Sequence, residues 1–415
     1  MTKEIPKERG IDHTFSLLTE GYNYVGKRMS GMDTDIFETR LLGKKMIIMT
    51  GRDAAELFYD ETKFKREGAL PLRVQKTLFG VGGIQTMDGQ KHKIRKAMFM
   101  SLMSDERLGL FRTIVKEEWD RKGHEMERKG EAVLFDESEE LILRAICRWT
   151  GVPLTDVESW NRAYDIGSLI DAAGGVGKRF RVGEDARPRT EAWLEEVILA
   201  VREGRLETDP ESAAHVVAFH QESGEYLDAH MAALELLNVI RPAVAVARFV
   251  VFAALALHDF PEWKEKLNTQ KDLNNFANEV RRFYPFTPFL GAIAKKDFEW
   301  HGYEFNEGET VLMDFHGVNR DPRLWEEPEQ FNPDRFNDFT DDRFTFIPQG
   351  GGDPNHGHRC PGEPVTVIII EESIRFLVNG LEYNVPQQDL MINMVRMPTL
   401  PASRFVMDRI KVKED

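Results

Sequence analysis

The chain has 415 residues, a formal net charge of −15 and only two cysteines. The negative charge argues against nucleic acid or an anionic membrane surface as a partner, because both are negatively charged themselves. Two cysteines are too few for a disulfide framework, and the first residues lack the apolar stretch of a signal peptide, so we predict a cytoplasmic protein.

Strand patterns lie near both ends of the chain, and helical periodicity fills the part between them. Short strands are predicted within 37–50, 296–315 and 405–412, the middle one as a hairpin with its turn at 306–309. Apolar residues at three-to-four spacing predict helices within 111–130, 136–152 and 189–206, the second ending at Gly151. No linker or internal repeat interrupts the chain, so we predict one mainly α domain over 1–415 with a small β portion.

The most apolar run, residues 243–257, contains Arg248. A membrane span needs about 20 apolar residues, so this run predicts a buried core helix and no membrane span. Arg241 and Pro242 stand just before it. Proline inside a helix removes a backbone donor and clashes with the carbonyl of Asn238, which predicts a kink at this point. Alternatively, Pro242 separates two helices and Arg241 is exposed.

Arg241 is flanked by apolar residues on nearly every side. A buried guanidinium is unfavourable unless an anion meets it, and its planar fork suits a carboxylate. No acidic residue follows within one turn, and Glu235 lies almost two turns earlier. The anion is therefore predicted to come from a ligand.

Residues 349–363, QGGGDPNHGHRCPGE, place His356, His358 and Cys360 directly before a predicted buried helix. The helix dipole there favours a thiolate at Cys360. Four interpretations compete: an inert cysteine, a zinc or non-haem metal site, a cysteine-hydrolase nucleophile, and a lone thiolate beneath a haem iron. Three ligands within five residues strain tetrahedral geometry, and no order of the histidines assigns a base and an oxyanion hole.

Residues elsewhere favour the haem interpretation. Glu279 and Arg282 lie three apart on one helical face, and Arg335 can complete a charge-assisted triad with them. Together with Phe346 and "GHRCPGE" around Cys360, these elements resemble the cytochrome P-450 superfamily. The resemblance implies the cytochrome P-450 fold, with haem b ligated by the Cys360 thiolate and buried between the kinked central helix and the cysteine loop. The loop is longer than the usual motif, which argues against an ordinary redox partner.

Within the superfamily, the chain resembles the fatty-acid peroxygenase branch over nearly its whole length. Residues 66–89, "ELLNVIRPAVA" and "EVRRFYPFTPFLGA" carry this similarity, and Arg241-Pro242 replaces the acid–threonine pair of the monooxygenases. The resemblance implies hydroxylation of long-chain fatty acids at the α and β carbons by hydrogen peroxide, without a redox partner. The substrate carboxylate on Arg241 would be the acid–base group, and decarboxylation to terminal alkenes would compete.

The resemblance also implies roles for single residues. Cys360 would be the axial iron ligand, Arg241 with Pro242 the carboxylate anchor, and Gln85 a distal residue where alkene-forming relatives can carry His. The other positions form two groups, which are the partners of the haem propionates (Arg66, His92, Lys96, His358) and the lining of an acyl-chain channel (Leu78, Phe79, Phe289, Leu290).

Two alternative functions stay open beside the peroxygenase. One is a conventional P-450 monooxygenase that depends on dioxygen and a redox partner. The other is a haem-thiolate sensor or carrier without turnover, which would show a haem spectrum but no oxidised fatty acid. The oligomeric state is not predicted.

Overall fold

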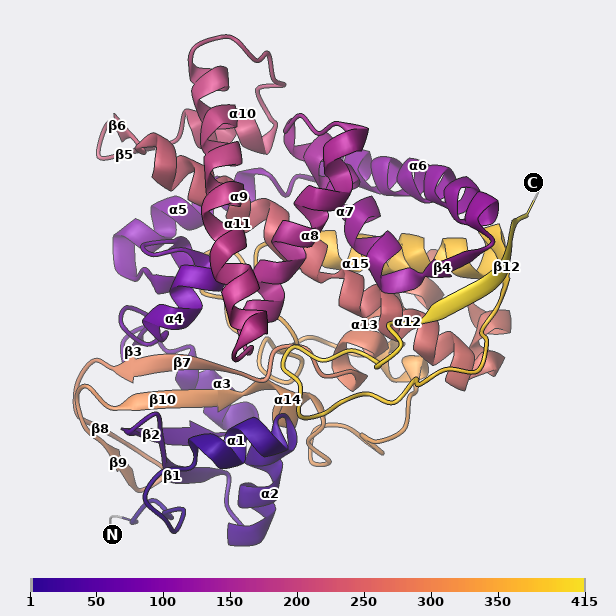
Figure 1. The fold of residues 1–415 in the computed structure, drawn as a ribbon. Coiled ribbons are helices and arrows are strands. Elements are labelled where there is room, and N and C mark those ends of the chain that lie inside the picture. The colour runs from indigo at the N-terminus through magenta and orange to yellow at the C-terminus, as the bar shows by residue number, and fades with distance from the viewer. Residues whose placement is uncertain (1–2, 414–415) are drawn as a thin grey trace.

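Helices from the middle and the end of the chain pack against one another, and most strands gather beside them near the N-terminus (Figure 1). The structure is a computed structural model that describes residues 3–413. The helical body contains the largest apolar cluster, and a second cluster lies against the largest sheet. The prediction of a mainly α fold with a small β portion is confirmed. That residues 1–415 form one domain stays a prediction.

The helices follow the predicted periodicity. Residues 111–129 fall in α6, whose C-cap is Gly130, and residues 136–150 fall in α7, whose C-cap is Gly151 with the positive φ of 76° that favours glycine. The α-helices are α1 (Thr14–Glu20), α2 (Asn23–Met32), α3 (Arg52–Phe58), α4 (Leu72–Val74), α5 (Gly89–Ser101), α6 (Asp105–Lys129), α7 (Leu134–Thr150), α8 (Asp156–Ala172), α9 (Lys178–Arg202), α10 (Ala213–Ala218), α11 (Ala229–Ala245), α12 (Ala247–Asp259), α13 (Gln270–Phe283), α14 (Phe315–Asn319) and α15 (Glu363–Arg375). Shorter turns are the π-helical η1 (Gln75–Phe79) and η5 (Phe376–Gly380) and the 3-10 turns η2 (Ile84–Thr86), η3 (Pro261–Lys266) and η4 (Pro333–Phe336).

The largest sheet has the strand order β1-β2-β10-β7-β3, and a smaller one has the order β11-β12-β4. In the larger sheet β10 runs parallel to β2 and antiparallel to β7. The strands are β1 (Ile36–Leu41), β2 (Lys44–Met49), β3 (Phe64–Lys65), β4 (Glu131–Val133), β5 (Gln221–Glu222), β6 (Glu225–Tyr226), β7 (Phe289–Ala294), β8 (Phe298–Trp300), β9 (Tyr303–Phe305), β10 (Thr310–Asp314), β11 (Leu381–Asn384) and β12 (Val406–Val412).

The predicted hairpin within 296–315 is only partly correct. The strands that pair are β8 and β9, and they turn at His301 and Gly302. The predicted turn at 306–309 exists, but it leads from β9 to β10, which pairs with β2 and β7. The reason is burial, because Val311 to Asp314 are buried and belong inside the larger sheet.

Helices α11 and α12 form the central apolar stretch, and 94% of its most apolar window is buried. The predicted core helix is therefore confirmed. Pro242 lies inside α11, so it does not separate two helices, and the predicted kink at Pro242 stays a prediction; the helix is interrupted four residues later, at Val246. Val246 donates its N–H to the carbonyl of Ala243, three residues earlier, at 3.0 Å, which is the hydrogen bond of a 3-10 turn. The alternative with an exposed Arg241 is excluded, since Arg241 is buried.

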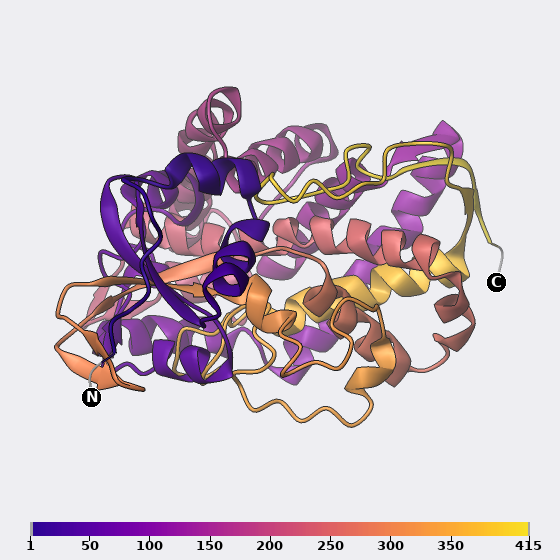
Figure 2. The same ribbon diagram turned by 90° about the horizontal axis from the view of Figure 1, so that it is seen from below.

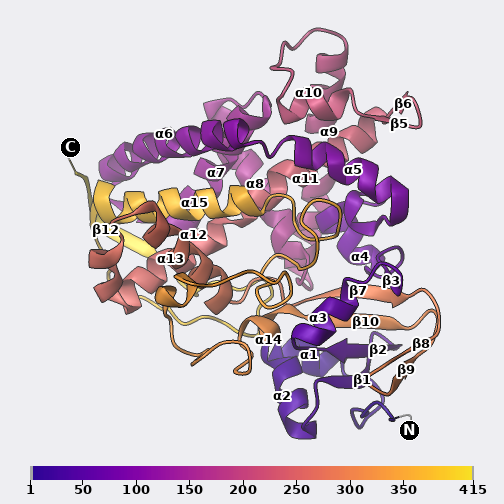
Figure 3. The ribbon, with the colours of Figure 1, turned by 180° about the vertical axis from the view of Figure 1, so that it is seen from behind.

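Seen from behind, α15 runs beside α6 and α13 (Figure 3). The loop that carries Cys360 leads directly into α15, whose N-cap residue is Gly362. This helix therefore holds the cysteine loop against the helical body.

Candidate functional site

The cysteine loop is held by hydrogen bonds at both ends. Cys360 donates its backbone N–H to the carbonyl of Gln349 at 3.1 Å, and the Gln349 amide nitrogen donates to the Thr366 hydroxyl of α15 at 2.9 Å. The same nitrogen lies 4.0 Å from the Cys360 sulfur. Gly350 has a φ of +101°, and a Cβ there would lie 3.0 Å from the Tyr59 hydroxyl. The loop thus presents one sulfur from a closely packed backbone.

The protonation of Cys360 differs from the expectation based on its helix-terminal position. Burial raises the pKa of the Cys360 thiol above its ordinary value. The Gly362 N–H and the Lys96 and Arg281 cations act in the opposite direction, but they do not outweigh the burial. In the protein by itself the sulfur therefore favours the thiol, because a helix terminus compensates only part of the cost of removing a thiolate from water.

The predicted contact among Glu279, Arg282 and Arg335 is confirmed. Arg282 donates to both oxygens of Glu279, at 2.7 and 2.8 Å, and Arg335 Nε lies 3.2 Å from the same carboxylate. Arg282 also donates to the carbonyls of Asn319 and Pro328. Because Glu279 and Arg282 are fully buried, this pairing fixes the segment after α14 to α13 and braces the core beneath the cysteine loop.

Arg241 is buried, and no carboxylate pairs with it among residues 3–413. Its Nη2 donates to the amide oxygen of Asn238 at 3.2 Å, its Nε has no hydrogen-bond partner, and its Cζ lies 5.3 Å from the centre of the Phe79 ring. Burial, with a smaller contribution from the Arg187 charge, lowers the pKa of Arg241 to about 9. Arg241 thus has no acidic partner among residues 3–413, and that a ligand supplies the anion stays a prediction.

Glu235, almost two helical turns before Arg241, already has partners of its own. Its carboxylate accepts from the Ile84 backbone N–H at 3.0 Å, from the Asn238 amide at 2.9 Å and from the Arg95 guanidinium. Asn238 therefore bridges the buried Glu235 carboxylate, which Arg95 already neutralises, and the buried Arg241 cation, which no acidic side chain of residues 3–413 neutralises. Burial raises the pKa of Glu235, against the opposing charge of Arg95.

Gln85 lies in η2, directly after the residue that Glu235 binds. Its Oε1 is buried and has no hydrogen-bond partner among the described residues. The preceding Gly83 lies close to the Asn238 amide, where a Cβ would be 3.1 Å from Nδ2. The structure thus brings the Gln85 turn against the helix of Arg241.

Arg248 has a different environment, although it lies seven residues after Arg241 in an equally apolar stretch. Its Nη2 lies 2.7 Å from Asp171, and its Nη1 lies 3.9 Å from Glu139. Phe135 covers it at 5.1 Å. Because Asp171 of α8 already pairs with Arg248, whereas no carboxylate of residues 3–413 pairs with Arg241, Arg241 is the cation of the two that can receive a ligand's carboxylate.

The four predicted propionate partners are buried or nearly so and come from three segments. The rings of His92 and His358 lie 4.1 Å apart, and the Lys96 ammonium donates to the carbonyl of Arg359 in the cysteine loop. Arg66 lies over the Phe58 ring at 4.0 Å. Burial lowers the pKa of His92 to about 3 and that of Lys96 to about 8.

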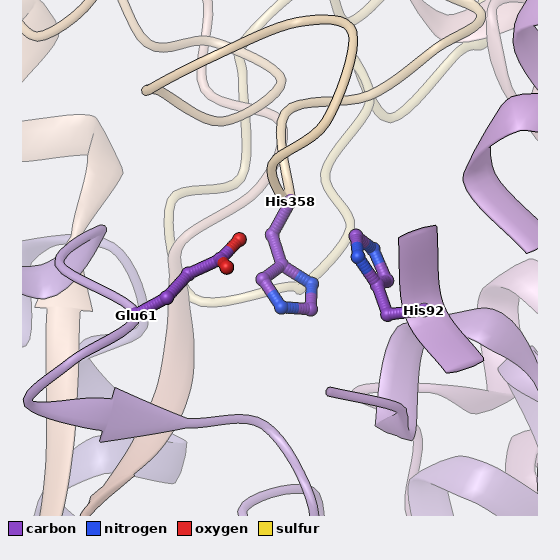
Figure 4. A group of neighbouring side chains, drawn as sticks. All are labelled: Glu61, His92 and His358. Atoms are coloured by element: carbon purple, nitrogen blue, oxygen red, sulfur yellow. The ribbon is translucent and has the colours of Figure 1, made fainter. Parts of the chain in front are cut away.

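Glu61, His92 and His358 point toward one another, and their ligand atoms lie within 4.8 Å (Figure 4). Two imidazoles and a carboxylate can hold a metal ion. However, the permanent charge of Arg66 acts on both imidazoles and disfavours a further cation.

These features fit a haem. The resemblance implies a thiolate-ligated haem, and the residues present offer the Cys360 sulfur, the buried cations Arg66 and Lys96, and polar atoms of Gln85 and Arg241 that have no partner among residues 3–413. Carboxylates of such a group would neutralise the buried cations, which the protein alone does not achieve.

The predicted channel residues divide between two places. Leu78 and Phe79 end η1, and Phe79 contacts Arg241. Phe289 and Leu290 begin β7 and pack against the apolar clusters of the N-terminal helices and of the sheet. That all four line one channel stays a prediction.

Sequence reasoning missed two residues that shape the Arg241 environment. Asn238 lies three residues before Arg241, a spacing that places both on one helical face and could have indicated the contact. Arg187 of α9 donates to the carbonyl of Leu78 at 3.1 Å. No local pattern marks Arg187, because its partner lies 109 residues away.

The sequence matches a protein-family model and curated proteins of the same family. The family model for cytochrome P-450 matches residues 260–389. Protopanaxadiol 6-hydroxylase of Panax ginseng is 23% identical over a match that covers 87% of this chain and 81% of the relative.

Two solved structures are similar over the whole chain. Cytochrome P-450EX alpha (CYP152N1), solved with myristic acid, is 42% identical with a TM-score of 0.95, and the match covers 99% of this chain and 100% of the other. A variant of cytochrome P-450 OleT in complex with arachidonic acid is 35% identical with a TM-score of 0.96, covering 99% of both chains.

Proposed function

We propose a specific reaction for this protein. The chain belongs to the cytochrome P-450 family and, within it, to the branch of CYP152 fatty-acid peroxygenases. The protein uses hydrogen peroxide to hydroxylate long-chain fatty acids at the α and β carbons. Decarboxylation to terminal alkenes competes with it. For each hydroxylation, one C–H bond and one molecule of hydrogen peroxide give one hydroxyl group and one water.

The cofactor we propose is haem b, with Cys360 as the axial ligand. Arg66, His92, Lys96 and His358 would bind its two propionates. When bound, a thiolate-ligated haem supplies the iron chemistry that inserts oxygen into an unactivated C–H bond.

The environment of Arg241 is the observation that carries the proposal. Among residues 3–413 its Nε has no partner and its only side-chain hydrogen bond is to the Asn238 amide, while Phe79 covers it and Arg248 pairs with Asp171. A fatty-acid carboxylate would meet the guanidinium as a charge-assisted pair. The α and β carbons of the fatty acid, which adjoin the carboxylate, would then be held at the Arg241 end of the site.

The bound carboxylate would also perform the acid–base chemistry. It takes a proton from one oxygen of hydrogen peroxide and returns a proton to the other, which leaves as water. Arg241 fixes the position of that carboxylate. Residues 229–259 contain no threonine, so the chain has no acid–threonine pair here to deliver protons.

This arrangement requires neither an electron donor nor dioxygen. A purified sample loaded with haem should therefore convert myristic acid with hydrogen peroxide alone, and analysis of the products should show 2- and 3-hydroxy acids. Turnover that needs a reductase and dioxygen would instead indicate the conventional monooxygenase. A haem spectrum without any product would indicate a sensor or carrier. A cytoplasmic location is part of the same proposal.

A further inference from the structure

Positive charge is concentrated in three segments of this acidic chain. None of the 70 aspartate and glutamate residues falls within 68–87, 172–183 or 390–407. The same segments contain Arg73, Lys76, Lys178 and Arg181, which are exposed and form no ion pair among residues 3–413. The net charge of −15 therefore does not describe this part of the surface.

Large apolar side chains are exposed on the same segments and on the neighbouring N-terminal helix. Phe15 of α1 and Met391 each expose 77% of their surface. We call the combined region the apolar–basic surface, and its exposed apolar residues are Ile11, Phe15, Leu72, Val176, Met391 and Val395. Exposed apolar residues that cluster mark interaction sites, whereas single ones are common on any protein.

Hydrogen bonds show that these segments are neighbours. Tyr22, after α1, donates its backbone N–H to the carbonyl of Met394 at 2.9 Å. Arg179, at the start of α9, donates to the carbonyl of Met397 at 2.7 Å, and Arg73 of α4 donates to the carbonyl of Gly175. Figure 2 shows the yellow loop that carries Met391 to Met397 reaching the indigo helices at the N-terminus.

The apolar–basic surface also continues into the Arg241 site. Leu72 begins α4, and α4 passes directly into η1, which ends with Leu78 and Phe79. The exposed Leu72 and the Phe79 that covers Arg241 are thus seven residues apart in one helical segment, about 10 Å along its axis.

We propose that the apolar–basic surface docks on an anionic lipid surface and receives fatty acids from it. Exposed apolar side chains would enter the lipid interface, and the four unpaired cations would meet carboxylate or phosphate groups. This inference rests on the proposed function for the identity of the substrate, but docking itself requires no turnover.

A second copy of the chain is a less suitable occupant. A two-fold contact would bring this surface against itself, and its positive charges would repel one another. An anionic lipid surface complements both its charge and its apolar side chains.

Flotation of the purified holoprotein with vesicles tests the docking. Binding to vesicles of phosphatidylglycerol with oleic acid should exceed binding to phosphatidylcholine vesicles at least tenfold, and added salt should weaken it. Phe15→Ser with Met391→Ser, or Lys178→Glu with Arg181→Glu, should each reduce binding at least tenfold. Matched controls are Val157→Ser, on a residue that is 88% exposed on α8, and Lys116→Glu with Arg128→Glu on α6, and both should bind like the wild type.

Turnover separates docking from the proposed reaction. The docking variants should oxidise dissolved fatty acid at the wild-type rate and vesicle-held fatty acid several-fold more slowly. Wild-type protein that binds vesicles but oxidises neither form would contradict the proposed reaction and leave docking supported. Equal binding to neutral vesicles, or docking variants that bind like the controls, would overturn the inference. So would variants that lose only self-association in ultracentrifugation, since the surface would then join two copies.

Discussion

The amide oxygen of Asn238 accepts a hydrogen bond from Nη2 of Arg241 at 3.2 Å. The amide nitrogen of Asn238 donates in turn to Glu235, so the orientation of the amide is fixed. A neutral acceptor orients the guanidinium without neutralising it. Arg241 thereby keeps its charge for a ligand.

Substitutions of Asn238 test this positioning. Asn238→Ala leaves polar atoms of Arg241 and Glu235 unpaired, so fatty-acid binding should weaken by about 1–2 kcal/mol, roughly tenfold. Asn238→Asp is closer in shape but brings an anion to Arg241, and it should weaken binding more than Asn238→Ala does. Titration with myristic acid measures both affinities. If Asn238→Asp binds better than Asn238→Ala, the amide has only a structural role.

Arg241 and Arg248 should respond differently to the same substitution. Arg241→Ala should weaken fatty-acid binding and peroxide-driven turnover by about 2–5 kcal/mol, because the carboxylate loses its charged partner. Arg241→Lys should recover only part, since an ammonium cannot form the bidentate fork. Arg248→Ala should instead lower the free energy of unfolding by about 1–3 kcal/mol, because the hydrogen bond to Asp171 is lost while Arg396 still pairs with that carboxylate. Near-normal turnover in Arg241→Ala, with inactive but folded Arg248→Ala, would reverse the assignment.

The two cysteines provide a matched pair for the haem ligand. Cys360→Ala should lose the absorption band of the reduced carbon monoxide complex that marks thiolate ligation. Cys147→Ala should keep it, because Cys147 is buried inside α7 and burial raises the pKa of its thiol. An unchanged spectrum in Cys360→Ala would end the haem-thiolate assignment.

Gln85 should influence the product. Its neutral amide cannot donate a proton as an imidazolium does, so we expect hydroxylation at the α and β carbons to exceed decarboxylation. Gln85→His should increase the share of terminal alkene. Chromatography of the products measures the ratio, and wild-type protein that forms mainly alkene would contradict this prediction.

Asp314 should make stability depend on pH. Burial raises the pKa of this carboxyl group to about 7, and its Oδ1 accepts the Gly317 N–H at 3.0 Å. Between its unfolded pKa near 4 and the folded value, the folded state binds more protons, so stability falls as pH rises. Asp314→Asn keeps an oxygen acceptor and should be more stable than wild type at pH 8, by at most about 4 kcal/mol. At pH 4 the difference in thermal unfolding should vanish.

Much of this protein can be read from local patterns in the chain. The periodicity of α6 and α7, the glycines that end them, and the buried character of α11 and α12 depend on neighbouring residues, so short windows predict them. The Glu279–Arg282 contact belongs to the same class, since three residues span one helical turn.

Other features depend on distant parts of the chain. Arg241 and Arg248 lie in similar apolar surroundings, and the pairing of Arg248 with Asp171, 77 residues earlier, is what distinguishes them. Strand β10 also paired differently from its prediction, because its buried residues required partners from β2 and β7.

The apolar–basic surface likewise could not be predicted from the sequence alone. Three acid-free segments can be found in the sequence, but they form one surface only where loop 391–397 meets α9 and the N-terminal helices. Net charge sums over the whole chain, whereas a lipid surface would meet only the side chains that folding brings to one face.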